Sequence, residues 1–407
     1  MSLTRDGRLL FCTRFLRLFS YGALSVVLVF YLTGLGLTQQ QTGLLLTLTL
    51  LGDTAISLAL TTQADRIGRR KMLIAGAALM AGAGIAFALT RNPLLLVIAG
   101  TIGVISPSGH EVGPFLPIEQ AALSQVIPSR DRTSFFAWYQ LTGAFATAAG
   151  SLFAGFFTQS LQRTGMTPVA SQRAILLLYA AMGLLLGLLF TRLSPTSEIA
   201  RDPSRPPLTA LLGIGASRTV VLRLSALMAL DAFGGGFVVQ SFAAWWFYLR
   251  FGVQPATLGG IFFAANLFAG ASALLASRIA ARIGLVRTMV FTHLPSNILL
   301  ILVPLMPTLP LAILVLLMRF SISQMDVPTR QSYIMAVVAP DERSAAAGIT
   351  GVARTTGAAF APIFAGLLFA NPATISVPFF LAGTLKILYD ILLYRAFVNL
   401  PPMDGLR

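Results

Sequence analysis

A histidine and a glutamate stand side by side where the chain looks least able to form a helix. His110 and Glu111 lie in the segment Ser106–Gln120, which holds three prolines and two glycines within eleven residues. Prolines and glycines at this density prevent a regular helix, and irregular backbone inside a membrane is tolerated only where it lines a cavity or is buried in protein. A carboxylate beside an imidazole can bind and release a proton near neutral pH. We therefore expect a substrate or proton site here; the alternative is a pair that hydrogen-bonds the loosened backbone.

Two more carboxylates and a guanidinium lie within other apolar stretches. Asp53 is near the middle of one run, Asp231 precedes three consecutive glycines in another, and Arg354 is near the middle of a third. An ionisable side chain inside a membrane span costs a few kcal/mol or more. Each is therefore a candidate for binding substrate or protons.

These groups leave the substrate class open. Arg330 and Arg354 would suit an organic anion, because a guanidinium pairs with carboxylate or phosphate through two parallel hydrogen bonds. The Phe-rich apolar composition with buried carboxylates would instead suit lipophilic cations, as in drug efflux. A third possibility is divalent metal transport that uses His110, Glu111 and Asp53.

A pair of opposite charges predicts a gate. Glu119 and Arg330 occupy the same place in two copies of the pattern Pro-x-x-Gln, as Pro117–Gln120 and Pro328–Gln331. We expect them to form, or contribute to, an ion pair between two halves of the protein when one side closes. Asp326 is a competing partner for Arg330, because residues four apart lie on the same helix face.

Other polar residues have simpler interpretations. Arg14 and Arg17 begin the first apolar run and are expected to extend toward the cytoplasmic surface. Lys386 and Asp390, four residues apart, are expected to pair with each other. The aromatic run Trp245–Tyr248 is expected to form an interfacial belt rather than a ligand platform.

The elements that carry these residues must lie in lipid. Of the 407 residues 56% are hydrophobic and 11% are charged, whereas a soluble domain carries roughly a quarter charged residues. Cys12 is the single cysteine, so the chain has no internal disulfide and no thiolate metal cluster. We predict an all-α integral membrane protein with twelve spans, each about 20 residues long, at about 12–34, 42–62, 72–90, 94–126, 134–158, 174–193, 219–249, 256–276, 288–306, 310–338, 345–369 and 375–398.

The net charge of +15 sets an orientation. The basic residues fall in short breaks between apolar runs, a pattern that fits positive-inside topology better than a nucleic-acid surface. It predicts a multi-pass protein of the plasma membrane (the bacterial inner membrane) with both termini in the cytoplasm. The Pro-rich segment 194–217 is expected to be a cytoplasmic linker between a first half, 1–193, and a second half, 218–407.

A short basic loop supports duplication of one half. Ala64–Lys71 reads A-D-R-I-G-R-R-K, and its core returns as Ala280–Gly284, followed by Arg287. Recurrence at about half the length of the chain indicates two six-helix halves of similar fold. Gly68 is expected to permit a tight turn or a close approach of helices, and Arg69 is expected at the anionic surface of the cytoplasmic leaflet.

On these residues the chain resembles the major facilitator superfamily. The family signature between spans two and three is G-x-x-x-D-[RK]-x-G-[RK]-[RK], and this chain departs from it only where the first glycine would stand. The resemblance implies alternating access around a central site and gating roles for Asp65, Arg66, Gly68 and Arg69. Asp65 would latch against the N-terminus of the eleventh span. Ala281 replaces the acid in the second copy.

The sequence thus predicts a secondary active transporter of a small molecule, not an enzyme. It is expected to be proton-coupled, an antiporter or exporter of organic anions or drugs, and a monomer among membrane lipids without cofactor, bound metal or nucleic acid. The fifth span lacks the proline-containing glycine motif of drug exporters, which weakens that subgroup. The alternatives are a metal-ion transporter and a non-transporting receptor on a transporter scaffold.

Overall fold

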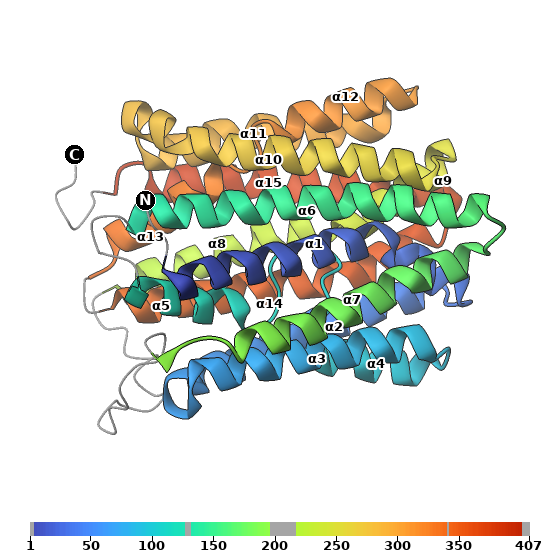
Figure 1. Cartoon of the computed structure of the whole chain (residues 1–407). Coiled ribbons are helices and arrows are strands. Elements are labelled where there is room, and N and C mark those ends of the chain that lie inside the picture. Colours follow the sequence, from blue (N-terminus) through green and yellow to red (C-terminus); the bar gives the residue numbers. More distant parts are fainter. Residues whose placement is uncertain (1–3, 127–131, 196–216, 340–341, 401–407) are drawn as a thin grey trace. The chain divides into compact units, whose positions relative to one another are not determined.

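The computed structural model describes residues 4–126, 132–195, 217–339 and 342–400. Within these ranges all regular elements are helices, as Figure 1 shows, in agreement with the predicted all-α fold. Their bounds are α1 Arg5–Gly34, α2 Gln39–Ile67, α3 Arg69–Leu89, α4 Pro93–Ile102, α5 Phe115–Val126, α6 Arg132–Arg163, α7 Pro168–Phe190, α8 Arg218–Gly236, α9 Gln240–Phe251, α10 Pro255–Ile283, α11 Leu285–Leu302, η4 Val303–Leu305, α12 Leu309–Phe320, α13 Asp326–Val337, α14 Arg343–Phe369, η5 Pro372–Thr374 and α15 Val377–Phe397.

The spans of the described chain agree with the predicted twelve. Ten helical stretches are long and apolar enough to cross a membrane, and two shorter apolar helices, α4 and α12, remain. Each short helix is followed by a second one, α5 or α13, after a non-helical break. The break at 103–114 is the one that its prolines and glycines predict. The sequence does not predict the break at 321–325, because that segment contains no proline or glycine.

The described residues form two compact units. The first comprises the described part of Met1–Pro203 together with Val239–Asn266, and the second comprises the rest. One unit boundary falls at the short break between α8 and α9, which follows three glycines that weaken helix continuity, and another falls within α10, between Asn266 and Leu267. The predicted six-helix halves, 1–193 and 218–407, with a linker at 194–217, stay a prediction.

Helices pack in the same order in both units. In the first unit α1 packs along α6 and α7, and α3 packs on α7; in the second unit α8 packs along α14 and α15, and α11 packs on α15. Figure 1 shows α1 and α6 of the first unit running side by side. Equivalent pairs in equivalent order are what a duplicated six-helix half produces.

One residue joins the helices at each copy of the basic loop. Gly68 lies between α2 and α3 with φ +121°, and Gly284 lies between α10 and α11 with φ +87°. L side chains are strained at such positive φ values, so glycine is the residue for this joint. The tight turn expected at Gly68 is confirmed, and the same requirement accounts for the glycine in the second copy.

A glycine contact brings α1 and α6 close together. A Cβ added at Gly150 of α6 would overlap the carbonyl oxygen of Phe19, and one added at Gly22 of α1 would overlap that of Thr147. Both neighbours are backbone atoms, which cannot rotate away as a side chain could. The crossing therefore depends on the absence of side chains at these two positions.

We predict that Gly150→Val lowers the melting temperature of the purified protein by about 5 °C or more, because overpacking costs about 1–3 kcal/mol or more. Thermal unfolding in detergent measures the effect. The matched control is Gly82→Val on α3, where an added Cβ meets no atom within 4 Å. Equal melting temperatures for the two variants would contradict this account of the crossing.

Candidate functional site

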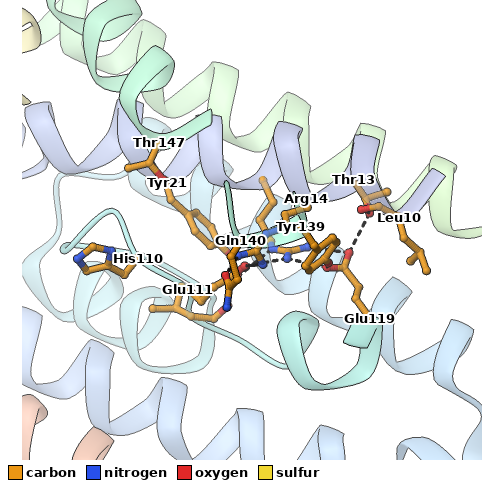
Figure 2. Close-up of polar contacts among 12 residues, drawn as sticks. Leu10, Thr13, Arg14, Tyr21, His110, Glu111, Glu119, Tyr139, Gln140 and Thr147 are labelled. Carbon is orange, nitrogen blue, oxygen red and sulfur yellow. Dashed lines mark hydrogen bonds and ion pairs between the residues drawn. The ribbon is translucent and has the colours of Figure 1, made fainter. Parts of the chain in front are cut away.

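Arg17 of α1 lies at the centre of a buried ionic network in the first unit. Figure 2 shows Arg14, Glu111, Glu119 and Tyr139, which belong to this network, lying close to one another. Its side chain is 0% exposed. Nη1 donates to Oε1 of Glu119 at 2.8 Å, and Nη2 donates to Oε2 at 2.7 Å. On its other side, Nε donates to Oε2 of Glu111 at 3.2 Å and Nη2 donates to Oε1 at 3.1 Å. One guanidinium thus joins α1, the break at 103–114 and α5.

Four neighbours complete this network. Arg14 is 2% exposed, forms an ion pair with Glu111, and donates from Nη2 to the amide oxygen of Gln140 at 2.5 Å. Thr13 donates to Glu119 at 2.8 Å, and the Tyr139 hydroxyl also donates to this carboxylate. The two arginines and two glutamates balance in charge.

The expected extension of Arg14 and Arg17 to the membrane surface is therefore wrong. They are buried because two glutamates compensate their charges, and a buried charge is tolerated when it is paired and hydrogen-bonded. The sequence contains a sign of this pairing. Arg14 and Arg17 are three residues apart on one helix face, and two acids, Glu111 and Glu119, follow in a single later span.

The structure does not bring His110 and Glu111 together as one site. Glu111 points into the arginine pair, whereas the exposed ring of His110 lies away from that network in Figure 2. Their adjacency in the sequence does not make them converge, because the backbone there is not helical. A joint role for the two side chains gains no support from this geometry.

Asp53 of α2 has a different environment from the two glutamates. It is 9% exposed and accepts a hydrogen bond from the backbone N–H of Gly113 at 2.6 Å and one from the Ser57 hydroxyl at 3.4 Å. Within the described part of the chain it forms no ion pair. A buried carboxylate without a cation is costly, and such groups concentrate at functional sites.

A second ionic network lies in the second unit. Asp231 of α8 accepts from Nη1 of Arg330 at 3.1 Å and from Nζ of Lys386 at 2.6 Å. Arg330 also pairs with Asp326 at 3.4 Å. The expected neighbouring pair on α13 is thus confirmed, and Asp231 joins α8, α13 and α15.

The pairing predicted between Lys386 and Asp390 is wrong. Lys386 reaches across to Asp231, and Asp390 instead contacts Nδ1 of His293 at 2.8 Å and accepts from the Asn297 amide at 3.0 Å. Residues four apart on a helix are neighbours, but each of these two side chains instead binds a buried partner on an adjacent helix.

The two networks have opposite polarity. In the first unit the cation Arg17 is on α1 and the anion Glu119 is on α5; in the second the anion Asp231 is on α8 and the cation Arg330 is on α13. Glu119 and Arg330 therefore each have partners inside their own unit. The ion pair expected between these two residues remains a prediction.

Other sequence predictions have mixed outcomes. The side chains of Asp65 and Arg66 lie outside the described residues, so their gating roles remain predictions. Arg69, expected at the lipid surface, is buried. Trp245 and Trp246, expected in an interfacial belt, are also buried, Trp246 completely. They pack within the first unit through α9, an arrangement that hydrophobicity alone does not reveal.

Comparison with known proteins places the fold and the family. The family model of the Major Facilitator Superfamily matches residues 10–325. The chain therefore belongs to this superfamily. It is 31% identical to the uncharacterized membrane protein YJR124C of Saccharomyces cerevisiae, over 97% of this chain and 95% of that protein. It is also 30% identical to a Na(+), Li(+), K(+)/H(+) antiporter of Planococcus maritimus, over only 36% of this chain and 32% of that one.

Solved transporters share the fold. The nucleoside transporter NupG matches with a TM-score of 0.77 and 14% identity, covering 97% of this chain and 100% of that chain. A D-xylose-proton symporter matches with a TM-score of 0.72 and 16% identity, covering 98% of each chain. Family and fold together identify a multi-pass membrane transporter rather than an enzyme.

We predict that Arg17→Met lowers the free energy of unfolding by about 3–5 kcal/mol, because it leaves buried carboxylate charge without its partner. Thermal unfolding measures the loss. Arg8→Met on the exposed face of α1 is the control and should change little.

A double variant separates lost charge compensation from lost packing. Adding Glu119→Leu to Arg17→Met removes one stranded carboxylate, while Glu111 keeps its bond to Arg14. The double variant should therefore be more stable than Arg17→Met alone. If it is less stable, the cost arises from packing and not from the unpaired charge.

Proposed function

We propose that this protein is a proton-coupled secondary transporter that moves a small organic molecule by alternating access, with Asp53 as the proton-binding group. The observation that supports it most directly is the position of Asp53: a buried carboxylate inside a span, without an ion pair in the described part of the chain. Intramembrane carboxylates of this kind serve in proton relays.

The other candidate carboxylates already have structural partners. Glu111 is held by Arg14 and Arg17, and Asp231 is held by Arg330 and Lys386. Their charges hold helices together, and protonating either would leave cations uncompensated. Asp53 can gain or lose a proton without breaking an ion pair.

The contacts of Asp53 also supply a route from protonation to movement. Its Oδ1 accepts from the N–H of Gly113, at the end of the irregular segment 103–114. A hydrogen bond to an ionised carboxylate is roughly twice as strong as one between neutral groups. Protonation therefore weakens the tie between α2 and this segment, which also carries Glu111. Proton binding and the position of the broken span become linked.

The proposal also includes the orientation of the chain and the membrane in which it lies. Both termini lie on the cytoplasmic side, which the basic loops at Ala64–Lys71 and Arg278–Arg287 support. The protein acts as a monomer among lipids. A relative also occurs in yeast, so the proposed location is not restricted to the bacterial inner membrane.

Three alternatives differ from the proposed function. A metal transporter would need converging ligands, and in the described ranges no group of three His, Cys, Asp or Glu side chains could hold a metal ion. Cation/proton antiport is the activity for which the Planococcus relative is named, and that relative matches over about a third of this chain. A receptor without transport would bind a solute but show no flux.

Proteoliposomes that contain a pH-sensitive dye test the function. Solutes are added outside one at a time: succinate, glycerol phosphate, uridine, xylose, tetraphenylphosphonium, sodium and potassium. A change of internal pH that requires both protein and solute supports proton-coupled transport. A response to sodium or potassium alone favours cation antiport, and binding of a solute without any flux favours a receptor.

We predict that Asp53→Asn abolishes accumulation of the active solute driven by a pH gradient but leaves solute exchange across the membrane, because the amide keeps the hydrogen-bonding shape and cannot carry a proton. Radiolabelled uptake with and without the gradient measures both. Asp6→Asn, which changes a buried carboxylate at the start of α1, is the control and should keep gradient-driven uptake. Gradient-driven accumulation by Asp53→Asn would exclude Asp53 as the proton site.

A further inference from the structure

One imidazole ring in the second unit lies between two buried carboxylates. Nδ1 of His293 on α11 is 2.8 Å from Oδ1 of Asp390 on α15, and Nε2 is 3.7 Å from Oδ1 of Asp231 on α8. These three residues are at most 6% exposed. Because α15 packs on both α8 and α11, all three helices meet at this ring.

Both ring nitrogens of His293 are next to a carboxylate oxygen. An ionised carboxylate only accepts hydrogen bonds, so Nδ1 must carry a hydrogen in order to bond to Asp390. Nε2 is beyond hydrogen-bond distance from Asp231 but within range of an ion pair. An unprotonated Nε2 would bring its lone pair close to a negative charge, whereas a protonated one is attracted to it. The ring is therefore placed to hold a second hydrogen.

The charges around the ring leave one carboxylate without a strong cation. The ionised groups of this network are three carboxylates and two strong cations, namely Asp231, Asp326, Asp390, Arg330 and Lys386. Asp231 and Asp326 are paired with the two cations. Among the described residues, the partners of Asp390 are the neutral amide of Asn297 and the ring of His293. One proton on His293 therefore balances the one negative charge that is left over.

The other charged and titratable groups near this network give Asp390 no direct partner. Tyr389 of α15 packs edge-on against the ring of His293, with centroids 5.9 Å apart, and a phenol is neutral near pH 7. Arg319 of α12 and Arg354 of α14 form no ion pair with a described carboxylate. Arg354 is also exposed.

We propose that His293, together with Asp390, binds a proton that holds α8, α11 and α15 of the second unit together. An imidazole and a carboxylate at hydrogen-bond distance take up and release protons as a pair. The site differs from Asp53 in its unit, its partners and its task. In the proposed function the proton on Asp53 accompanies the solute, whereas the proton on His293 stays in the network. The inference does not depend on proton-coupled transport.

Loss of this proton weakens the contact between the three helices. Asp390 would then keep only neutral partners, and Nε2 would lie beside Asp231 without a positive charge. A buried carboxylate whose charge is not compensated is costly. Because the folded network holds a proton that the unfolded chain does not hold in this way, the stability of the second unit falls as rising pH removes the proton.

Nuclear magnetic resonance of the histidine rings tests whether the proton is there. The chain contains two histidines, His110 and His293, so ¹⁵N-labelled histidine gives two sets of ring signals, which His110→Gln assigns. Full-length protein in lipid nanodiscs is titrated from about pH 5 to about pH 9. We expect imidazolium signals from His293 at the acidic end, lost at a pH that differs by about 1–3 units between the unaltered protein and Asp390→Asn.

A second buried acid supplies the control for this titration. Asp6→Asn, at the start of α1 in the first unit, should leave the pH dependence of the His293 signals unchanged. Signals of a neutral His293 ring at every pH in the unaltered protein overturn the proposal. The same pH dependence in the unaltered protein and in Asp390→Asn also overturns it.

A double variant tests whether the proton acts through charge. His293→Gln removes the ring and leaves the charge of Asp390 unbalanced, and adding Asp390→Asn restores the balance. The double variant should therefore melt at a higher temperature than His293→Gln alone. A lower melting temperature would mean that the ring acts through packing, which contradicts the proposal.

The same double variant serves as the reference for the effect of pH on stability. Relative to it, the melting temperature of the unaltered protein should fall as the pH rises through the titration of His293, because the double variant lacks the site. A constant difference through that titration overturns the proposal. Neither measurement uses a solute, so the site is established or excluded whether or not the protein moves protons in proteoliposomes.

Discussion

The buried guanidinium of Arg17 is the interaction on which the first unit depends. It satisfies two carboxylates that come from separate parts of one broken span, Glu111 and Glu119. Removing charges from water costs several kcal/mol per ion, and only good geometry repays this. A small displacement of α1 or α5 would therefore lose much of the compensation at once. Such a network favours a few discrete arrangements over continuous deformation, which suits the alternating access proposed above.

The buried polar residues have different roles according to whether an ionic partner compensates their charge. Side chains whose charges are matched by ionic partners, such as Arg17 and Asp231, fix helices against one another. Asp53, in the first unit, is held by hydrogen bonds and has no ion pair in the described part of the chain.

The sequence predicts much of the fold, but it predicts little of the pairing between side chains in the site. The length of the apolar runs predicts the spans, and the prolines and glycines around His110 predict the first break. The recurrence of Gly68 as Gly284 predicts the tight turn between two helices. The sequence does not show in the same way which side chains on different helices pair. Sequence spacing favours Lys386 with Asp390 because it reports neighbours on one helix, whereas Asp231, on a different helix, is the partner. The spacing of Arg14 and Arg17 places them on one helix face, but it does not identify Glu111 as the acid packed against Arg14.

The opposite polarity of the two networks bears on the history of the chain. An ancestral homodimer of identical six-helix proteins would have carried the same charge at both equivalent positions, on α1 and α8 alike. In this chain Arg17 on α1 and Asp231 on α8 instead carry opposite charges, and so do their partners, Glu119 on α5 and Arg330 on α13. Neither half can now replace the other. A gene built from two copies of the first half would encode two identical ionic cores and no counterpart of the second.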